Sequence, residues 1–265
     1  MAESGVSAGM TTPSPRLPSI VWVTGGGSGI GRELARLYAR SGAAVAISGR
    51  RADALAETAE GFPNIHAFPL DVTDPAAVAA TIAAIEDSLG AIGLAVLGAA
   101  QYTPMSAAQF NQATFRRTFE TNVIGVGNVL DPLLNRMGTR RTGTIAVVAS
   151  VAGYSGLPKA SAYGASKAAL INMAEALNPE AARMGVRIAV INPGFVATPL
   201  TAVNEFKMPF LISPEIAAER IRRGLERGGF EIAFPRRFAW LLKLVRLLPY
   251  PLYFSLTRRM VTGID

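Results

Sequence analysis

The sequence contains no cysteine and a single histidine, and these absences exclude several kinds of chemistry. Without cysteine, the chain can form no disulfide framework, no thiolate nucleophile and no cysteine-based metal site. The one histidine, His66, excludes sites built from several histidines and argues against a Ser-His-Asp triad. It lies in an apolar, strand-like run, so we interpret it as structural and expect no metal site. The lack of cysteine suits a reducing compartment, and we expect a cytoplasmic protein.

Charged residues are also few, at 17% of the 265 residues, whereas 50% are hydrophobic, so a large core is easily built. The formal net charge is nevertheless +7. Residues 236–265 contain six Lys or Arg and one acidic residue, a net charge of +5, and the body of the chain is close to neutral. No zinc-finger or basic-zipper pattern accompanies this charge, so we expect no nucleic-acid partner.

Residues 1–18 are rich in Ser, Thr, Pro, Gly and Ala and have no hydrophobic periodicity, which predicts a disordered N-terminal extension. They show no cationic start followed by an apolar core, so we do not expect a signal peptide. The folded domain is therefore expected to begin at residue 19.

A glycine-rich turn follows the first apolar run of this domain. Residues 20–24 predict a short buried strand, the next residues complete the sequence TGGGSGIG, and a helical pattern comes after it. Gly25 allows the tight turn, Gly29 lets the backbone approach a pyrophosphate, and Gly31 lets helix and strand pack closely. The free N–H groups at the helix N-terminus suit phosphates. This order of elements predicts a dinucleotide-binding unit.

The second predicted strand, residues 44–48, is followed by Gly49, Arg50 and Arg51 rather than by a carboxylate. A cofactor without a 2′-phosphate usually meets Asp or Glu at this point, whereas Arg can hold a 2′-phosphate through two hydrogen bonds. We therefore favour NADP(H) over NAD(H). The alternative is that both arginines only form the solvated start of a helix.

Further apolar runs alternate with helical patterns along the chain. We predict strands over residues 64–70, 94–97, 144–149 and 186–191, a candidate seventh strand over 230–234, and helices over 74–88, 106–135, 160–184 and 213–227. Apolar strands that alternate with helices indicate a parallel sheet covered on both faces. We therefore expect one α/β domain over residues 19–235, of the Rossmann-type doubly wound kind with about seven strands.

The sequence SAYGASKAA over residues 161–169 contains Tyr163 and Lys167, which lie four residues apart and therefore on one face of a helix. A nearby ammonium favours the phenolate, so the pKa of the tyrosine would fall from about 10 toward the working range. Such a pair can act as a general acid and base at a carbonyl or hydroxyl oxygen. Alone the match is weak, because an exposed tyrosine above an exposed lysine is common.

Taken in order, these motifs resemble those of the short-chain dehydrogenase/reductase family over roughly residues 19–200. The resemblance rests on the glycine turn, Asp71 after the third strand, Asn122 in the fourth helix, Ser150, Tyr163, Lys167 and the Pro193-Gly194 pair. Ser150 precedes Tyr163 by thirteen residues, as the family's catalytic serine does.

The resemblance implies a catalytic set of Ser150, Tyr163, Lys167 and Asn122. In this set Tyr163 is the general acid/base, and Lys167 lowers its pKa and holds the nicotinamide ribose. Ser150 stabilises charge on the substrate oxygen, and Asn122 helps position a proton-relaying water. Asp71 and Val72 would border the adenine, and Thr198 would contact the carboxamide. The candidate cofactor-binding residues are Thr24, Gly25, Gly27, Ser28, Gly29, Ile30, Gly31, Arg50, Arg51, Asp71, Val72, Tyr163, Lys167, Pro193, Gly194, Val196 and Thr198.

The chain departs from the family after the fourth strand, where Gly98 replaces the usual asparagine and Ala100 the usual glycine. In the family that asparagine steadies the central strand through side-chain hydrogen bonds. The rigidity of this segment is therefore a question for the structure.

In the family, residues 198–211 correspond to a mobile lid over the substrate, and here the segment is apolar. We therefore expect an NADP-preferring oxidoreductase that interconverts a hydrophobic ketone or aldehyde and its alcohol. Two alternatives stay open. One is a non-redox epimerase or dehydratase on the same scaffold, and the other is a cofactor-binding regulator or scaffold.

Residues 236–265 predict a basic amphipathic C-terminal extension. At helical spacing Arg236, Lys243 and Arg246 lie on one side, while Phe238, Leu241, Leu242, Val245 and Leu248 cover the other. Residues 236–259 can lie on an anionic membrane surface, but their charges and prolines prevent a span. Alternatively, the apolar side packs on the body or on a second subunit. Because family members usually oligomerise, we expect a homodimer or homotetramer.

Overall fold

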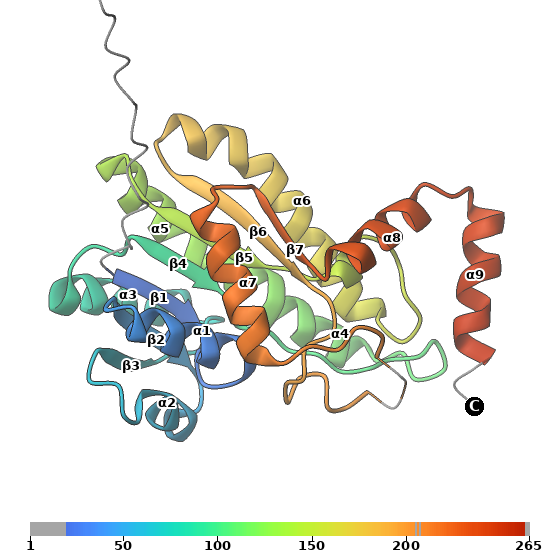
Figure 1. Ribbon diagram of the computed structural model, residues 1–265, viewed down its shortest axis with the longest axis horizontal. Coiled ribbons are helices and arrows are strands. Elements are labelled where there is room, and N and C mark those ends of the chain that lie inside the picture. The colour runs from blue at the N-terminus through green and yellow to red at the C-terminus, as the bar shows by residue number, and fades with distance from the viewer. Residues whose placement is uncertain (1–19, 205, 207, 263–265) are drawn as a thin grey trace, which may run out of the picture.

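The computed structural model describes residues 20–204, 206 and 208–262. Its centre is a sheet of seven parallel strands in the order β3-β2-β1-β4-β5-β6-β7 (Figure 1). The strands are β1 (Ile20–Thr24), β2 (Ala44–Gly49), β3 (Ile65–Pro69), β4 (Leu94–Leu97), β5 (Thr144–Val148), β6 (Arg187–Pro193) and β7 (Glu231–Phe234). The prediction of a doubly wound parallel sheet with about seven strands is confirmed.

Helices cover both faces of this sheet, and the last two of the described helices lie beyond β7. They are α1 (Gly29–Arg40), α2 (Ala52–Ala59), α3 (Pro75–Leu89), α4 (Gln112–Phe119), α5 (Gly125–Arg140), α6 (Ser161–Arg183), α7 (Pro214–Glu226), α8 (Arg236–Arg246) and α9 (Tyr250–Thr262). A π-helical turn, η1 (Glu120–Ile124), joins α4 to α5, and a short 3₁₀ turn, η2 (Val151–Gly153), follows β5.

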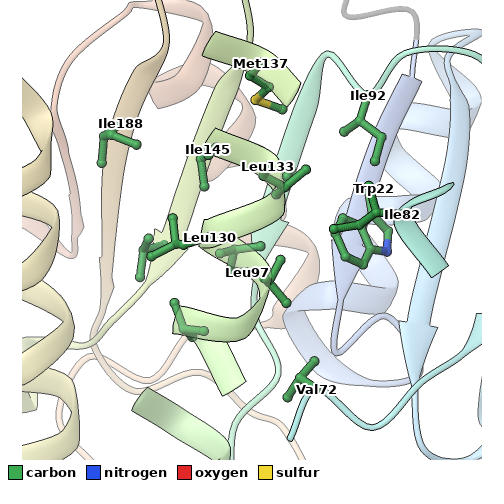
Figure 2. Close-up of a cluster of buried hydrophobic side chains, with 14 of the residues drawn as sticks. Trp22, Val72, Ile82, Ile92, Leu97, Leu130, Leu133, Met137, Ile145 and Ile188 are labelled. Atoms are coloured by element: carbon green, nitrogen blue, oxygen red, sulfur yellow. The ribbon is translucent and has the colours of Figure 1, made fainter. Parts of the chain in front are cut away.

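Two apolar layers hold the sheet, because successive side chains of a strand point to opposite faces. On β1, Trp22 packs into the layer under α3, α5 and α6, whereas Val21 and Val23 pack into the layer under α1 and α7. Figure 2 shows the first layer, in which Leu133 and Met137 of α5 lie against strand residues such as Ile145. These residues are fully buried, so each side of the sheet has a continuous core.

The helix expected over residues 106–135 differs from the prediction. It starts at Gln112, because the Asn111 side chain accepts a hydrogen bond from the Thr114 N–H and caps the first turn. It then runs through η1 into α5 and ends at Arg140. A π-helical turn takes one extra residue, and such turns occur frequently at functional sites.

The predicted extension at residues 1–18 lies outside the described residues. At the other end, the tail forms α8 and α9, which are separated around Pro249 and lie beyond β7 (Figure 1). The predicted sides of the first of these helices are partly wrong. Leu241 is exposed, whereas Lys243 turns toward the body and pairs with Glu231, because Ala239 and Leu242 are the residues that pack. Within residues 20–204, 206 and 208–262, no helix is long and apolar enough to cross a membrane.

Candidate active site

The candidate residues gather where the strands end. In a parallel sheet all carboxyl ends lie at one edge, and a crevice opens where the strand order reverses, here between β1 and β4. The glycine turn follows β1, Arg50 follows β2, Asp71 follows β3, and Ser150 follows β5. Segments far apart in the sequence therefore meet at one place.

The glycine turn leaves no room for side chains. A Cβ on Gly25 would lie 2.7 Å from the Gly98 carbonyl oxygen, and one on Gly31 would lie 2.3 Å from the Gly25 carbonyl oxygen. Gly29 has a φ of +52°, and a Cβ there would lie 2.8 Å from the Thr198 methyl carbon. The N-terminus of α1 opens onto this bare backbone, and the Ser28 side chain does not cap it. The turn therefore fits a pyrophosphate that approaches the backbone closely.

Two adjoining cavities lie on either side of this turn, and they share Gly25, Ser28 and Ala100. The first has a volume of about 380 Å³, and its walls include Arg50, Arg51, Asp71 and Val72. The second has a volume of about 150 Å³. The walls of the second include Gly29, Ile30, Gly31, Ser150, Tyr163, Lys167, Pro193, Gly194, Val196 and Thr198. Of the candidate residues, all of which are described, Thr24 and Asn122 line neither cavity. The paired cavities fit the two halves of a dinucleotide.

The rim of the first cavity is basic. Arg50 and Arg51 are exposed, and neither forms an ion pair with a residue that the structure describes. The neighbouring Arg32 differs, because its guanidinium donates to both carboxylate oxygens of Glu57 at 2.6 and 2.9 Å and to the Gly27 carbonyl oxygen at 2.8 Å. Arg32 thus holds the glycine turn, whereas Arg50 and Arg51 leave their donors for a ligand.

Ser150, Tyr163 and Lys167 converge in the second cavity. The Ser150 hydroxyl donates to the Pro193 carbonyl oxygen at 3.3 Å and accepts from the Ala152 N–H at 3.1 Å. The Lys167 Nζ donates to the Val148 carbonyl oxygen at 2.7 Å and lies 5.5 Å from the centre of the Tyr163 ring. The structure thus brings together the three residues that the spacing in the sequence assigned to one site.

Burial sets the acidity of the two ionisable groups. It raises the pKa of Tyr163 to about 12, although the neighbouring Ser150 side chain acts in the opposite direction. Burial likewise lowers the pKa of Lys167 to about 7, because desolvation disfavours the ammonium. The expected lowering of the tyrosine pKa by Lys167 is therefore not seen, because burial is the largest influence on the phenol and favours its neutral form.

The Asn122 side chain forms hydrogen bonds within the protein and does not line either cavity. It is fully buried in η1, where its Oδ1 accepts from the Gln101 N–H at 2.7 Å. Its Nδ2 donates to the Gln101 carbonyl oxygen at 3.0 Å and to the Ser166 hydroxyl at 3.0 Å. Both amide hydrogens are used, so the side-chain amide has no donor for the relay water that the resemblance implied. The residue joins the segment after β4 to α6.

The segment after β4 is held by a different residue from the one that the family uses. A Cβ on Gly98 would lie 2.9 Å from the Thr24 carbonyl oxygen, so asparagine would not fit without a shift. The Thr24 hydroxyl oxygen instead accepts from the Gly98 N–H at 3.1 Å and the Ala99 N–H at 3.2 Å. Thr24, which we expected to bind cofactor, thus steadies the strand end that the missing asparagine would have steadied.

The sequence analysis missed Tyr102. Its ring meets the Tyr163 ring edge to face at 4.9 Å, and its hydroxyl donates to Asn204 Oδ1 at 2.8 Å. Asn204 belongs to the apolar segment that we interpreted as a lid. No pattern in the sequence indicates the hydrogen bond between Tyr102 and Asn204, because it joins positions 102 residues apart.

Comparison with known proteins places this chain in a family. The family model described as short chain dehydrogenase matches residues 19–208. A relative from Myxococcus xanthus (strain DK1622), called an uncharacterized oxidoreductase, is 36% identical over 242 residues, which cover 90% of this chain and 96% of that protein. The 3-oxoacyl-[acyl-carrier-protein] reductase FabG from Thermotoga maritima is 32% identical over 183 residues, or 68% of this chain and 74% of that protein.

Among solved structures, a variant of actinorhodin polyketide ketoreductase with NADPH is similar, with a TM-score of 0.74 and 25% sequence identity. The match covers 82% of this chain and 95% of that chain. The chain therefore belongs to the short-chain dehydrogenase/reductase family, and it is an oxidoreductase of that type. Proteins of this family bind NAD(P)(H).

Proposed function

We propose that this protein is an NADP(H)-preferring oxidoreductase that interconverts a hydrophobic ketone or aldehyde and its alcohol, with Tyr163 as the general acid/base. The observation that carries the proposal is the convergence of Ser150, Tyr163 and Lys167 on one cavity that adjoins the glycine turn. We assign this chemistry to a catalytic domain over residues 19–235, with residues 236–265 as its extension.

The cofactor fits the two cavities as a pair. Its pyrophosphate would meet the glycine turn and the N-terminus of α1, and its two ends would meet the Arg50 rim and the Tyr163 cavity. When bound, the nicotinamide supplies a hydride to the substrate carbon or accepts one from it. The protein must then place the substrate oxygen and move one proton.

Tyr163 and Ser150 suit that task. A phenol with a pKa of about 12 is protonated at pH 7, so Tyr163 Oη can donate its proton to a carbonyl oxygen as negative charge develops there. The Ser150 hydroxyl can rotate from the Pro193 carbonyl to donate a second hydrogen bond to the same oxygen. In the oxidative direction Tyr163 would act as the phenolate, which accepts the proton of the alcohol, while the Ser150 hydroxyl holds the alcohol oxygen.

Lys167 suits the replenishment of that proton. Its pKa of about 7 lies near the working pH, where a group exchanges protons most readily in both directions. The amine lies over the tyrosine ring, at 5.5 Å from its centre, and is fixed there by the Val148 carbonyl. A charged Lys167 would also stabilise the phenolate that forms during reduction.

The substrate side of the second cavity is apolar. Pro199 and Leu200 line it. Phe195 follows the lining residue Gly194, and its ring lies 5.8 Å from that of Phe206 and 5.9 Å from that of Phe238. Hydrophobic walls favour a hydrophobic substrate. The names of two similar proteins, a 3-oxoacyl reductase and a polyketide ketoreductase, support a ketone as the reacting group.

The Arg50 and Arg51 donors support a preference for NADP(H), because guanidinium pairs with phosphate through two parallel hydrogen bonds. The alternative of a cofactor-binding regulator was based on the loss of the asparagine at position 98. Thr24 supplies hydrogen bonds to this segment, so that loss no longer favours a regulator. Cytoplasmic location and a homodimeric or homotetrameric state stay predictions of the sequence.

The test is substrate-dependent NADPH oxidation, followed at 25 °C with a panel of hydrophobic ketones. We expect turnover by the wild-type chain, and we expect Tyr163→Phe to lose on the order of a hundredfold or more in kcat. NADPH binding, measured by fluorescence, should stay within about twofold in that variant, because the phenol oxygen alone is removed. Full activity in Tyr163→Phe would refute the role of the phenol. Turnover of a substrate without NADPH consumption would instead support a non-redox reaction.

A further inference from the structure

The outward face of α8 is apolar. Trp240, Leu241, Leu244 and Leu247 recur at helical spacing, and their exposed fractions are 61%, 53%, 58% and 78%. Of the α8 residues, all of which are described, Ala239 and Leu242 are the buried ones. A helix at the surface of a globular protein usually shows polar residues to solvent, so this arrangement is reversed.

The next helix carries further exposed apolar residues. Tyr250, Leu252, Phe254, Leu256 and Met260 of α9 are also exposed. Among residues 250–260 of this helix, Tyr253 is the one that is buried, and its hydroxyl donates to the Gly156 carbonyl oxygen. Figure 1 shows α9 standing off from the body beyond α8. We call residues 236–262 the C-terminal arm.

The arm is anchored at its base. Ala239 and Leu242 pack on Val151, and the Phe238 ring lies 5.9 Å from the Phe210 ring. Lys243 pairs with Glu231 of β7. These contacts fix the inner side of α8, so the apolar residues of its outer side are held toward solvent.

A basic groove lies beside this face. It has a volume of about 650 Å³ and runs between α7, β7 and α8. Five arginines line it, namely Arg220, Arg223, Arg227, Arg236 and Arg237. Trp240 lines the same groove, so the apolar face and the arginines form one continuous surface.

Little negative charge offsets these arginines. The one carboxylate in the groove wall, Glu231, already accepts from Lys243, the Tyr154 hydroxyl and the Asn192 amide. Arg223 has a partner, Glu219, at 3.5 Å. The groove is therefore positive as a whole, and it suits an anionic surface.

We propose that the C-terminal arm and the adjoining arginine groove dock the protein on an anionic phospholipid bilayer. Trp240, Leu241, Leu244 and Leu247 enter the boundary between headgroups and acyl chains, and the arginines bind lipid phosphates. An exposed Trp beside a Leu row and a basic flank is the composition that interfacial helices use. This inference is independent of the proposed reaction.

A second copy of the chain fits this surface less well. A two-fold interface is built from the same patch on both copies, so it would bring two sets of five arginines into one contact. The chain also carries a net charge of +7, so two copies repel at long range. An anionic bilayer is complementary to both features, because its phosphates can pair with the arginines and its acyl chains can contact the apolar face.

The test is co-sedimentation of the full-length protein with vesicles. We expect binding to phosphatidylcholine vesicles that contain about 30% phosphatidylglycerol, at least about tenfold weaker binding to pure phosphatidylcholine, and weakening with added salt. Absence of binding to the anionic vesicles overturns the proposal. So does equal binding to both vesicle types.

Two pairs of variants locate the contact. Leu244→Asp should reduce vesicle binding at least about tenfold, whereas Ile216→Asp, which changes a similarly exposed aliphatic residue on α7, should not. Arg236→Glu with Arg237→Glu should likewise reduce binding at least about tenfold, whereas Arg116→Glu with Arg117→Glu, exposed on α4, should change it at most about twofold. Circular dichroism melting confirms that each variant is folded.

The control outcomes are decisive. If both arginine pairs reduce binding equally, net charge alone explains it and the docking surface is refuted. Size-exclusion chromatography with light scattering examines the rival occupant. A wild-type oligomer that Leu244→Asp dissociates, with no vesicle binding by either form, would show that the arm joins two copies and would overturn the proposal.

Discussion

The Tyr102 and Tyr163 rings meet edge to face, with their centroids 4.9 Å apart and their planes at 63°. The Tyr102 hydroxyl donates to Asn204 Oδ1 at 2.8 Å, so one side chain touches both the candidate acid/base and the segment proposed as a lid. Edge-to-face pairs contribute about 0.5–1.5 kcal/mol beyond their buried area. Tyr102 therefore packs against the phenol of Tyr163 and joins it to the segment proposed as a lid.

This contact predicts different effects for two substitutions. Tyr102→Phe keeps the ring pair but loses the bond to Asn204, worth about 1 kcal/mol, so KM for the ketone should rise about fivefold with kcat nearly unchanged. Tyr102→Ala also removes the ring pair, so kcat should fall as well. Steady-state kinetics with NADPH at saturation separates the two effects. Equal loss of kcat in both variants would contradict a role for the ring.

Lys167 predicts an unusual pH dependence of stability. Its pKa is lowered from 10.5 to about 7 by burial, so above pH 7 the folded chain holds a neutral amine while the unfolded chain keeps its proton. The unfolded state then binds more protons, and the free energy of unfolding rises with pH, on the order of 1 kcal/mol per unit. Below pH 7 both states carry the charge, and the cost of burying it is fully present.

Urea unfolding at pH 7, 8 and 9 measures this slope in the cofactor-free protein. This window ends before the unfolded tyrosines ionise, which matters because the raised pKa of Tyr163 gives the opposite slope above about pH 10. Lys167→Met should remove most of the rise. Lys159→Met, at the loop before α6, serves as the control and should keep it. A flat wild-type profile would mean that Lys167 is charged in the folded state.

The close packing around Gly98 predicts that the family's usual asparagine at this position would destabilise this protein. A Cβ at this position would lie 2.9 Å from the Thr24 carbonyl oxygen, which is backbone at the end of β1 and cannot move freely. Gly98→Ala should therefore lower the free energy of unfolding by about 1–3 kcal/mol, and Gly98→Asn by at least as much. The midpoint of urea denaturation reports the change.

Gly127→Ala is the matched control for this effect. Gly127 lies inside α5, and a Cβ there would meet nothing within 4 Å. The substitution should stabilise the protein by up to about 1 kcal/mol, because alanine restricts the unfolded chain and favours helix. If Gly98→Asn raised stability or cofactor affinity, the segment would have to shift to admit the side chain, and the role of Thr24 would be secondary.

Much of the site could be predicted because its signals are local. The glycine turn, the Ser150 position after a strand and the four-residue spacing of Tyr163 and Lys167 each depend on one secondary-structure element. The strand order then brings them together, because carboxyl ends of parallel strands share one edge. Local patterns and one topological rule were therefore enough to predict that these residues lie together at one edge of the sheet.

The remainder depends on contacts between distant elements. The hydrogen bonds of Asn122 to Gln101 and Ser166, and those of Thr24 to the segment after β4, exist only when the sheet is complete. The buried and exposed sides of α8 were predicted incorrectly for the same reason. Hydrophobic residues occur on more than one face of this helix, and the contact with Val151 buries Ala239 and Leu242. Periodicity alone cannot choose among several apolar faces.

The two exposed arginines after β2 give the sharpest prediction about cofactor choice. Arg50→Ala with Arg51→Ala removes charged donors from the rim of the 380 Å³ cavity, and a charge-assisted hydrogen bond is worth about 1.5–3 kcal/mol. The Kd for NADPH should therefore rise about tenfold to a hundredfold, while the Kd for NADH changes by less than about twofold. Arg32→Ala differs, because Arg32 holds the Gly27 carbonyl of the glycine turn and should weaken both cofactors alike. Fluorescence titration measures the Kd of both cofactors for the wild type and for the two variants. Equal weakening of NADPH and NADH by the double variant would mean that these arginines do not recognise the 2′-phosphate.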